Sequence, residues 1–487
     1  MDIRPTFDPQ SGTPIYRQLG LYLQNLIERG TLRSGDRLPP TRELAIQIGL
    51  NRTTISAAYE LLESEGLIKG EVGRGSYVCG RIERGLKPLD WTRALTMSAS
   101  TSAGNPATGV ISFTSSRPSE KLFPVEEFRE CCREVLDGSG LKTLMQLGSP
   151  GGYEPLRRYL MEGAAGQGVA RESDDILITN GCQQALDLLR RSLVRAGDKV
   201  AIEEPVYPGL KNLFLEAGAE LIGVPLDSNG IDLDGLRQAF LAGAKVLVVT
   251  PSFQNPTGAT ILRGHREEIC RLARAAGAVI VENDIYADLL CEGAAKALPR
   301  LKEIDPNVIM LGSFSKIAFP GLRVGFIIAP RPVIARATEL KQLADLHTDH
   351  LSQAFLLRFA ESGKLARHRA IVIAETRQNL RALEQSCKRF LTGCRWRVPG
   401  GGMNMWVELP SGLDAVALRG LAQQAGIDYL PGRYFSISRS MDSGLRLSFA
   451  GLDPSEIRKG IEILGAVIQN ALAARAEQET HPAFALV

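Results

Sequence analysis

The feature that most constrains the fold is an alternation of short apolar segments with amphipathic segments between residues 174 and 330. The apolar segments are rich in β-branched residues, which predicts strands: DDILITNG, DKVAIEEP, KVLVVTPS, AVIVEND, NVIMLGSF and RVGFIIAP. Segments of helical character, such as QQALDLLRRSLVRAG, separate them. Strands that alternate with helices form a mostly parallel sheet covered on both faces. We therefore predict an α/β domain that binds its ligand at the carboxyl ends of the strands.

Length and composition limit the remaining possibilities. At 487 residues the chain predicts two or three domains. Its apolar runs are too short to span a bilayer, and MDIRPTFDPQ lacks the apolar core of a signal peptide, so we expect a cytoplasmic protein without a membrane partner. Eight cysteines without a CxxC motif indicate reduced thiols. Five histidines without HxxxH or HExxH spacing favour no metal site.

The first eighty residues predict a helix-turn-helix. Ile15 to Gly30 has apolar residues at helical spacing, and a short helix follows that Thr41 can cap. Gly49 supplies a tight turn before a further helix that begins at Arg52, and residues at the start of such a helix reach base edges and phosphates. LIKGEVGRGSYV then predicts two short strands around a glycine-rich tip, a wing. The alternative is an ordinary three-helix bundle with solvated polar residues.

Charge in this segment is arranged rather than abundant. Residues 1–80 hold nine Lys and Arg against nine Asp and Glu, and the whole chain has a formal net charge of only +3. Basic residues concentrate between 29 and 59, whereas acidic residues dominate from 60 to 71. This asymmetry is compatible with a DNA-facing surface.

The same segment resembles the winged helix-turn-helix of the GntR family. GDRLPPTRELA, NRTTISAAYELLESEGLI and GRGSYV carry the resemblance. It implies a domain that binds double-stranded operator DNA, usually in pairs on two half-sites. The DNA contacts that it implies are Arg42, Arg52, Thr53, Thr54, Arg74 and Gly75.

Domain boundaries follow from the loss and return of periodicity. Residues 81–108 lack periodicity and are rich in Ser, Thr, Gly and Ala, which predicts a linker. We therefore expect a DNA-binding domain at 1–80, the linker at 81–108, a large domain at 109–470 and a tail at 471–487.

Chemically distinctive residues follow the predicted strands. TNGCQQ opens a helix with small and polar residues that can hold a phosphate on free N–H groups, although many such turns bind nothing. Asn255 follows one strand in a rigid Asn-Pro step, and SFSK places Lys316 after another. Asp284 and Tyr286 follow AVIVEN; taken alone, Asp284 would be interpreted as a helix cap. A buried aspartate is costly unless a cation is nearby.

Together these residues meet the requirements of a pyridoxal cofactor: a Schiff-base lysine, an acid for the ring nitrogen, partners for the ring hydroxyl and a phosphate cradle. We therefore predict pyridoxal 5'-phosphate as the cofactor. The residues in these roles are Lys316; Asp284; Asn255 with Tyr286; and Gly181, Cys182, Gln183, Ser313, Ser315 and Arg323.

Residues 109 to 470 resemble fold-type I aminotransferases, with a small C-terminal α/β subdomain. ITNGCQQALDLL, EEPVYPG, TPSFQNPTG, ENDIY, SFSK, PGLRVG and LRLSFAG carry the resemblance. It implies that Tyr207 stacks on the cofactor ring and that Arg446 binds a substrate carboxylate. The alternatives are core packing for Tyr207 and an ion pair for Arg446. Arg433 is either a second basic group for the ligand or a surface arginine.

Two positions depart from the aminotransferase pattern. Leu147 stands where the family has a tyrosine that reaches the cofactor phosphate of the partner subunit. We therefore do not expect that contact in this chain, although we still expect it to bind the cofactor. Arg117 replaces the usual glycine before the first proline of FTSSRPSEKLFP, so access of the substrate is expected to differ.

The two halves together resemble the MocR subfamily of bacterial transcription regulators. The resemblance implies a head-to-tail homodimer and a cofactor site that acts as a sensor, in which an amine effector displaces Lys316 from the internal aldimine and DNA binding changes. Arg446 favours an effector with a carboxylate or sulfonate. Two further hypotheses remain: a regulator that senses the cofactor level itself, and a working aminotransferase that carries a DNA-binding domain, since the residues for transamination are present.

Overall fold

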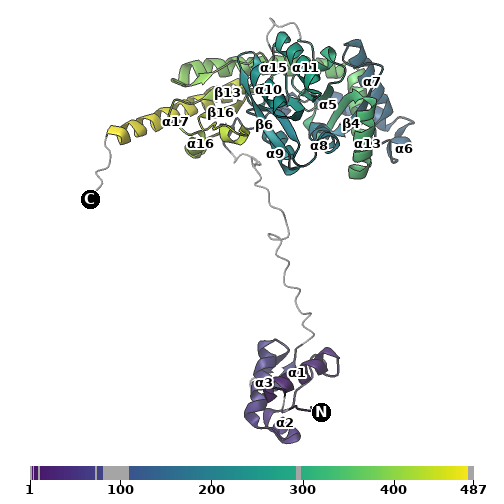
Figure 1. Ribbon diagram of the computed structural model, residues 1–487, viewed down its shortest axis with the longest axis vertical. Coiled ribbons are helices and arrows are strands. Elements are labelled where there is room, and N and C mark those ends of the chain that lie inside the picture. Colours follow the sequence, from purple (N-terminus) through teal and green to yellow (C-terminus); the bar gives the residue numbers. More distant parts are fainter. Residues whose placement is uncertain are drawn as a thin grey trace. The chain divides into compact units, whose positions relative to one another are not determined.

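The computed structural model describes residues 3, 5–8, 11–71, 74–79, 109–291 and 298–480. The chain divides into two compact units, Met1–Ser100 and Thr101–Val487 (Figure 1). The predicted linker at 81–108 and residues 481–487 of the predicted tail lie outside the described residues. Among the described helices, none combines the length and the apolar character needed to cross a bilayer.

The N-terminal unit is a winged helix-turn-helix, as predicted. Its elements are α1 (Ile15–Glu28), α2 (Thr41–Ile48), α3 (Arg52–Ser64), β1 (Ile68–Glu71) and β2 (Gly75–Val78), with the two strands antiparallel. Gly49 ends α2 in the left-handed conformation at a φ of 71°, which makes the tight turn before α3. Thr41 is the first helical residue and Pro40 is the N-cap, so the expected capping by Thr41 is not formed.

One apolar core holds this unit together. Leu19 and Leu23 of α1 pack on Ile55 and Leu62 of α3, and all four are fully buried. Burial of each such side chain contributes about 1.5–3 kcal/mol. The core therefore fixes α3 and leaves its first turn at the surface, where Arg52 is exposed.

The second unit is built on an eight-stranded sheet. In spatial order its strands are β4 (Asp174–Asn180), β11 (Val324–Pro330), β10 (Ile309–Ser313), β9 (Val279–Asn283), β8 (Ala244–Val249), β5 (Lys199–Glu204), β6 (Glu220–Asp227) and β7 (Gly230–Ile231). The predicted, mostly parallel sheet is confirmed, but β11 runs antiparallel to both neighbours. Only residues 314–323 join β10 to β11, which is too short for the crossover that a parallel pair requires.

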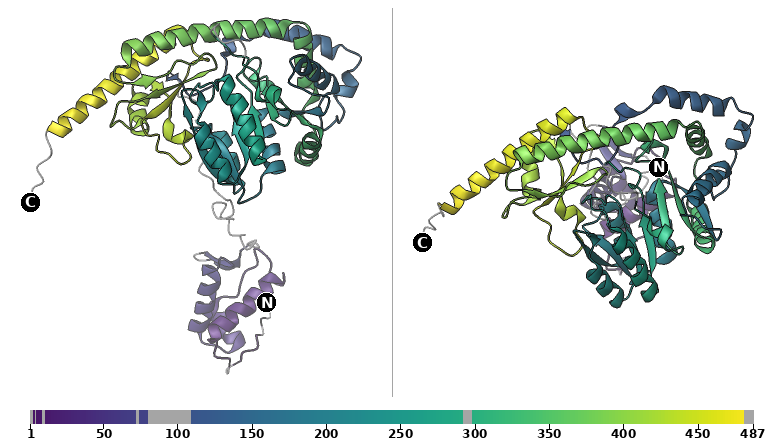
Figure 2. Two further views of the ribbon diagram at one scale, coloured as in Figure 1. Left: turned by 45° about the horizontal axis from the view of Figure 1, so that its top comes forward. Right: turned by 90° about the horizontal axis from the view of Figure 1, so that it is seen from above.

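Helices cover both faces of this sheet (Figures 1 and 2). Val246 and Val248 of β8 belong to the core shared with α8 (Gly181–Leu193), α9 (Pro208–Glu216) and α13 (Arg331–Asp345). Leu247 and Val249 belong to the core shared with α10 (Leu233–Leu241) and α11 (Arg263–Ala276). We call these the α8 face and the α11 face. On the side of the α11 face, α7 (Glu154–Gly166) and α14 (His350–Glu361) pack with β4, β10 and β11.

A smaller C-terminal subdomain completes the unit. Its sheet has the order β12 (Arg395–Trp396), β13 (Asn404–Glu408), β16 (Gly444–Ser448) and β15 (Leu430–Pro431). Helices α15 (Lys364–Phe390), α16 (Ala415–Gln424) and α17 (Pro454–Thr480) pack on it, and α15 and α17 lie side by side (Figure 2). Helix α17 continues past residue 470, where the large domain was predicted to end.

The start of the large unit is tied to this subdomain. Strand β3 (Ile111–Ser112) pairs in parallel with β14 (Ile427–Asp428), so the chain enters the unit beside residues that lie more than 300 positions later. The other short elements are η1 (Glu120–Leu122), α5 (Val125–Leu136), α6 (Leu141–Leu144), α12 (Leu301–Ile304), η2 (Pro320–Leu322) and η3 (Gly432–Phe435).

Candidate functional site

Lys316 lies just beyond the carboxyl end of β10, partly buried. Its Nζ donates to the carbonyl oxygen of Ser116 and lies 5.5 Å from the centroid of the Tyr286 ring. Burial lowers the pKa of Lys316 to about 8, and the positive charge of Arg446 adds to this effect. A lysine that is readily deprotonated is a nucleophile suited to a Schiff base with an aldehyde.

A cradle for an anion is formed where α8 begins. Gly181 is the first residue of α8 and has a φ of +72°, and a Cβ on it would lie 2.5 Å from Nη2 of Arg323. Arg323 donates to the carbonyl oxygen of Asn180 at 3.3 Å. The free N–H groups of a helix start together with a guanidinium suit a phosphate. Only glycine leaves room for this arrangement.

The other predicted cradle residues line the same region. Ser313 Oγ accepts from the N–H of Ser315 at 3.1 Å. The Cys182 thiol donates to the carbonyl oxygen of Gly312 at 3.3 Å, and burial raises its pKa to about 12, so it stays protonated and does not compete with Lys316. Gln183 is directed elsewhere, donating to the carbonyl oxygen of Gly209 at 3.3 Å.

Asn255 links two predicted site residues. Its Nδ2 donates to the hydroxyl of Tyr286 at 3.5 Å, and its Oδ1 accepts from Nη1 of Arg446 at 3.0 Å. All three side chains are buried. The structure therefore brings the expected partner of the ring hydroxyl next to the expected partner of a carboxylate.

Arg446 is a buried cation on β16 with no carboxylate partner among the described residues. Only 3% of it is exposed, its Nη2 donates to the carbonyl oxygen of Thr114, and its Nε has no partner. Burial lowers its pKa to about 10. A buried charge without a counter-ion is unfavourable, so this position suits an anionic ligand and not the ion pair considered as its alternative.

Tyr207 is the N-cap residue of α9 and 43% of it is exposed. Its ring lies over Gly209, where a Cβ would come within 2.5 Å of Cε1. An exposed ring face beside the cradle helix is available for stacking, which core packing would not leave.

Asp284 is paired with Arg300. Its carboxylate is 3% exposed and forms an ion pair with Nε of Arg300 at 2.5 Å. Burial raises the pKa of Asp284 to about 6, against the lowering effect of Arg300. The preceding residue, Asn283, donates from Nδ2 to Oγ1 of Thr250 at 3.3 Å. The Oδ1 atoms of Asn283 and Asp284 are both buried without a partner.

Arg433 is not brought to Arg446. It is 54% exposed and forms ion pairs with Asp414 at 3.0 Å and with Asp442 at 2.8 Å. This is the arrangement of a surface arginine. Leu147, at the position of the missing family tyrosine, is 77% exposed, and Arg117 is also exposed.

Two contributors to the site were not anticipated. The segment from Thr114 to Ser116 provides the two carbonyl oxygens that meet Arg446 and Lys316, and Ser116 Oγ also donates to Oδ1 of Asn404. Asn404 is the second contributor. Segment 114–116 carries no motif because its contribution is made by backbone atoms.

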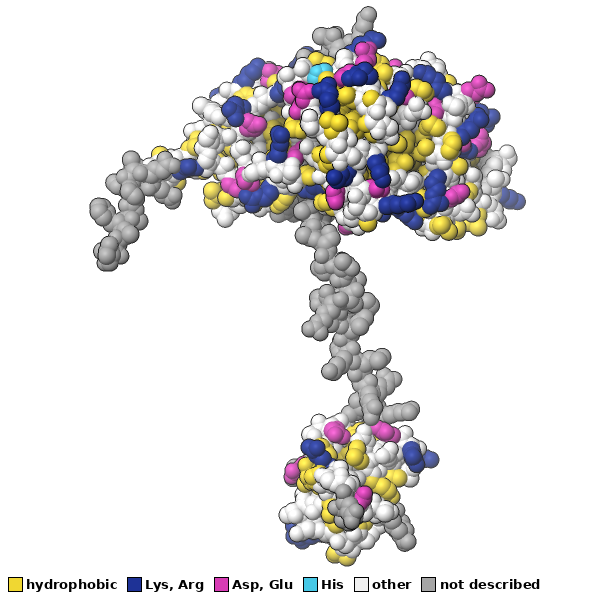
Figure 3. All heavy atoms as spheres, in the orientation of Figure 1, with side chains coloured by type: hydrophobic (Ala, Val, Ile, Leu, Met, Phe, Trp, Pro, Cys, Tyr) yellow, Lys and Arg dark blue, Asp and Glu magenta, His cyan; other side chains and the backbone are white. Residues whose placement is uncertain are grey.

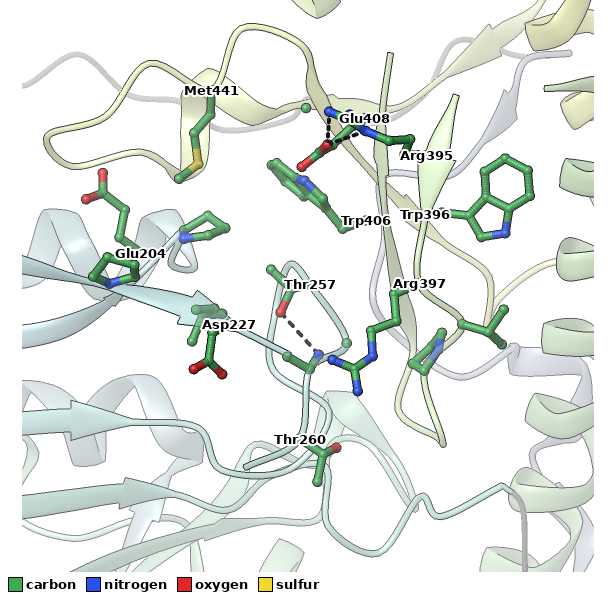
Figure 4. A pocket seen from close by; sticks show the side chains of 18 of the residues that line it. Glu204, Asp227, Thr257, Thr260, Arg395, Trp396, Arg397, Trp406, Glu408 and Met441 are labelled. Atoms are coloured by element: carbon green, nitrogen blue, oxygen red, sulfur yellow. Dashed lines mark hydrogen bonds and ion pairs between the residues drawn. The ribbon is translucent and has the colours of Figure 1, made fainter. Parts of the chain in front are cut away.

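A cavity of about 650 Å³ lies elsewhere in the large unit (Figure 4). It is lined by loops next to β5, β6 and β8 and by β12 and β13, and it includes Trp406 and Met441. None of the predicted cofactor residues lines it. Its Arg395 is paired with Glu408 at 3.0 Å (Figure 4). Arg397 donates to the carbonyl oxygen of Ser228 at 2.5 Å. Arg395 and Arg397 are therefore already engaged.

The predicted DNA contacts lie at the surface of the N-terminal unit. Arg52 and Thr53 are exposed on the first turn of α3, and Arg42 is exposed on α2. Thr54 is half-buried. The visible surface mixes basic and acidic side chains, as the balanced charge count requires (Figure 3).

The wing carries the remaining predicted contacts. Arg74 lies 3.7 Å from Glu71 and 78% of its side chain is exposed. Gly75 has a φ of +112°, and a Cβ on it would lie 2.9 Å from Nε of Arg37, a residue not anticipated as part of the wing. Arg37 therefore supports the wing and offers a further basic group beside it.

Two family models match the chain. Residues 110–464 match "Aminotransferase class I and II", and residues 15–78 match "Bacterial regulatory proteins, gntR family". The first match spans most of the chain, so the chain belongs to the aminotransferase class I and II family, whose cofactor is pyridoxal 5'-phosphate. Its combination of the two domains is that of the MocR subfamily of regulators, as predicted.

Relatives support the same assignment. An uncharacterized HTH-type transcriptional regulator, YdfD of Bacillus subtilis, is 30% identical and covers 95% of this chain and 98% of its own. The probable rhizopine catabolism regulatory protein MocR of Rhizobium meliloti is 28% identical and covers 94% of each. The structure of LysN, an alpha-aminoadipate aminotransferase from Thermus thermophilus, has a TM-score of 0.73 at 33% identity, covering 79% of this chain and 100% of its own.

Proposed function

We propose that this regulator senses a small amine with an acidic end, a carboxylate or sulfonate, and that occupation of its cofactor site changes its binding to operator DNA. One observation carries the proposal. Lys316 and Arg446, the amine-binding and acid-binding groups, donate to the carbonyl oxygens of Ser116 and Thr114 in one short segment. That segment follows directly, through β3, on the residues that connect to the DNA-binding unit.

The residues present fit pyridoxal 5'-phosphate. Gly181, Ser313, Ser315 and Arg323 provide a phosphate cradle in which a Cβ on Gly181 would collide with the guanidinium. Asn255 and Tyr286 hold hydrogen-bonding groups together for the ring hydroxyl, Tyr207 presents an exposed ring, and Cys182 lies beside the cradle. When bound, the cofactor supplies an aldehyde that joins reversibly to primary amines. Lys316, readily deprotonated, is the resident amine.

Arg446 defines the acidic end of the effector. A guanidinium binds a carboxylate or sulfonate through paired hydrogen bonds, and here it has an unpartnered Nε to offer. Asn255 holds Nη1 at 3.0 Å and so fixes the orientation of the group. An acid on Arg446 would compete with the Thr114 carbonyl and so release segment 114–116 at that residue. An effector amine that takes the aldehyde would return Lys316 to the free amine, which can then donate to the carbonyl oxygen of Ser116.

Release of this segment is the proposed link to DNA binding. A ligand shifts a conformational equilibrium only by its difference in affinity for the two states, and conversion from 1:99 to 99:1 requires about 5.5 kcal/mol. Loss of the hydrogen bond from Arg446 to Thr114, worth about 1.5–3 kcal/mol, would shift this equilibrium by about 10- to 100-fold. We assign sensing to residues 109–470 and DNA binding to residues 1–80, with 81–108 as the linker and 471–487 as the tail. The family matches at 110–464 and 15–78 support this division.

On the DNA side, we assign base and phosphate contacts to Arg52, Thr53 and Thr54, backbone contacts to Arg42, and wing contacts to Arg74 and Gly75. Their exposure, apart from that of Thr54, supports this. We further propose a head-to-tail homodimer that presents two winged helices to two half-sites. A pair of domains compensates for the lack of net positive charge in each, since phosphate contacts add across the half-sites.

The test uses the full chain loaded with pyridoxal 5'-phosphate. It is titrated with a panel of amino acids and amino-sulfonates while its visible absorption and its binding to DNA upstream of its own gene are recorded. We expect a persistent spectral change together with altered DNA binding. Conversion of the cofactor to its amine form with release of keto acid would instead identify an aminotransferase. A response of DNA binding to the cofactor alone would identify a sensor of cofactor level. Lys316→Ala is the control, because it lacks the resident amine.

A further inference from the structure

We propose that the ring nitrogen of the cofactor meets the amide of Asn283 and not a carboxylate, so that this site lacks the charge that keeps the nitrogen protonated. The inference rests on the proposed function, since it concerns the same cofactor site. It explains why a chain with aminotransferase residues would hold an amine instead of converting it. It also replaces the role expected for Asp284.

Sheet order places the nitrogen at the end of β9. In pyridoxal 5'-phosphate the ring nitrogen stands opposite the aldehyde, with the hydroxyl on one side of the aldehyde and the phosphate arm on the other. The phosphate cradle comes from the start of α8, the carboxyl end of β10 and Arg323 just before β11, and the hydroxyl partner Asn255 follows β8. Strand β9 lies between β10 and β8. Its carboxyl end therefore faces the ring edge that carries the nitrogen.

Strand alternation decides which residue of β9 faces the cofactor. Val281 packs in the core of the α8 face, whereas Ile280 packs in the core of the α11 face. Side chains two positions apart share a face. Asn283 therefore belongs with Val281 on the face of the cradle helix α8, and Asp284 belongs with Ile280 on the opposite face.

The contacts of Asp284 agree with this. Its carboxylate forms the ion pair with Arg300, which is the N-cap residue of α12. Leu301 of α12 packs in the core of the α11 face, and Arg300 also donates to Gln167 at 3.3 Å. Glu282, likewise paired through α12, accepts from the N–H groups of Leu301 and Lys302. Oδ2 of Asp284 is thus engaged on the side of α12.

The contacts of Asn283 leave it free to serve a ligand. It is 8% exposed, and the one hydrogen bond of its side chain goes to Thr250, the residue that follows β8. Its Oδ1 is buried without a partner, although buried polar atoms are normally hydrogen-bonded. With the amide turned by 180°, Oδ1 accepts from the Thr250 hydroxyl and Nδ2 is free to donate to an unprotonated ring nitrogen placed between β8 and β10.

An amide and a carboxylate have different consequences for bound amines. Loss of the α-proton from a bound amino acid leaves an electron pair that the ring accepts readily only when its nitrogen is protonated. A carboxylate stabilises that proton by charge, whereas an amide offers a hydrogen bond and no charge. With Asn283 in place, the bound amine keeps its α-proton and the signal persists.

The test is the protonation of the ring nitrogen, read from its NMR shift in the full chain loaded with isotopically labelled cofactor. We expect the wild type and Asp284→Asn to show the same unprotonated shift. We expect Asn283→Asp to move the shift toward the protonated value. An adjacent opposite charge raises a pKa by about one to three units, so the protonated fraction should rise about tenfold or more at a fixed pH below saturation. Release of keto acid from a bound amino acid should accelerate in this variant.

The inference would be overturned if the ring nitrogen were protonated in the wild type and lost that proton in Asp284→Asn. It would also be overturned if Asn283→Asp folded and bound the cofactor but showed the same NMR shift as the wild type. If Asn283→Asp does not fold, comparison of the wild type with the isosteric Asp284→Asn still decides. Failure of the proposed function looks different: no amine of the panel would then change DNA binding, whatever the NMR shift of the ring nitrogen.

Discussion

The low pKa of Lys316 predicts how fast the protein takes up its cofactor at each pH. Only the neutral amine attacks an aldehyde, and Lys316 is neutral above its pKa. Burial brings this pKa to about 8 from an ordinary value of 10.5. Because each pKa unit is a factor of ten, the neutral fraction at pH 7 exceeds that of an ordinary lysine by about 300-fold. We therefore expect rapid loading at neutral pH.

The shape of the pH profile is the sharper part of this prediction. Apo protein is mixed with pyridoxal 5'-phosphate in a stopped-flow instrument, and the growth of the visible band is followed from about pH 6 to about pH 10, with a blocked lysine as the reference amine. Dividing the two rates removes the titration of the cofactor. Below the pKa of Lys316 this ratio should be constant at about 300, and above pH 8 it should fall about tenfold per unit as Lys316 saturates.

Arg446→Gln is the informative variant. Arg446 is the second cause of the lowered pKa of Lys316, after burial. Removing its positive charge should move the break in the profile to higher pH while most of the shift remains. A ratio near one throughout, with no break in the wild type, would refute the reasoning. It would mean that the ammonium of Lys316 is as well solvated as that of a free lysine.

Three further perturbations separate the cofactor, the effector and the DNA. Arg446→Ala should weaken an acidic amine by about 10- to 100-fold, from the ~1.5–3 kcal/mol of a hydrogen bond to a charged group, and leave a non-acidic amine unaffected in a spectral titration. Gly181→Ala should lower cofactor affinity about tenfold or more in equilibrium dialysis. A left-handed φ costs an L-residue about 1–2 kcal/mol, and the new Cβ displaces Arg323. Gly163→Ala, in open space on α7, is the control and should leave cofactor affinity unchanged. Arg52→Ala should weaken operator binding and reduce the salt slope by about one, with the visible spectrum unchanged; loss of both would contradict two separate domains.

The architecture was predictable because it depends on local sequence patterns, namely hydrophobic periodicity and turn residues. Alternating strands and helices gave the mostly parallel sheet, and the turn at Gly49 followed by Arg52 gave the helix-turn-helix. The antiparallel direction of β11 depended on the shortness of the connection 314–323 and not on the strand itself, which is equally apolar. A strand sequence does not encode the direction of its neighbours.

The candidate site was predictable only where a single side chain provides the functional group. Lys316, Arg446 and Asn255 converge as expected, because each follows or lies within a strand that the pattern locates. The carbonyl oxygens of Thr114 and Ser116 were not foreseen, since every residue type has a carbonyl and its direction depends on how β3 pairs with β14. Contacts made by backbone atoms do not depend on the residue type, so the sequence does not reveal them.

The pair Asn283 and Asp284 shows that a chemical requirement alone does not decide between two neighbouring residues of a strand. An acid near the ring nitrogen was required, and the nearest acid in the sequence was taken. Yet residues adjacent on a strand point to opposite faces of the sheet. Asp284 forms an ion pair with Arg300, the N-cap residue of α12. If Asn283 holds the nitrogen, the difference between an enzyme and a sensor reduces here to one charge. A regulator gains from that loss, because an effector that is consumed on binding cannot hold segment 114–116 in its displaced state long enough to alter the occupancy of DNA.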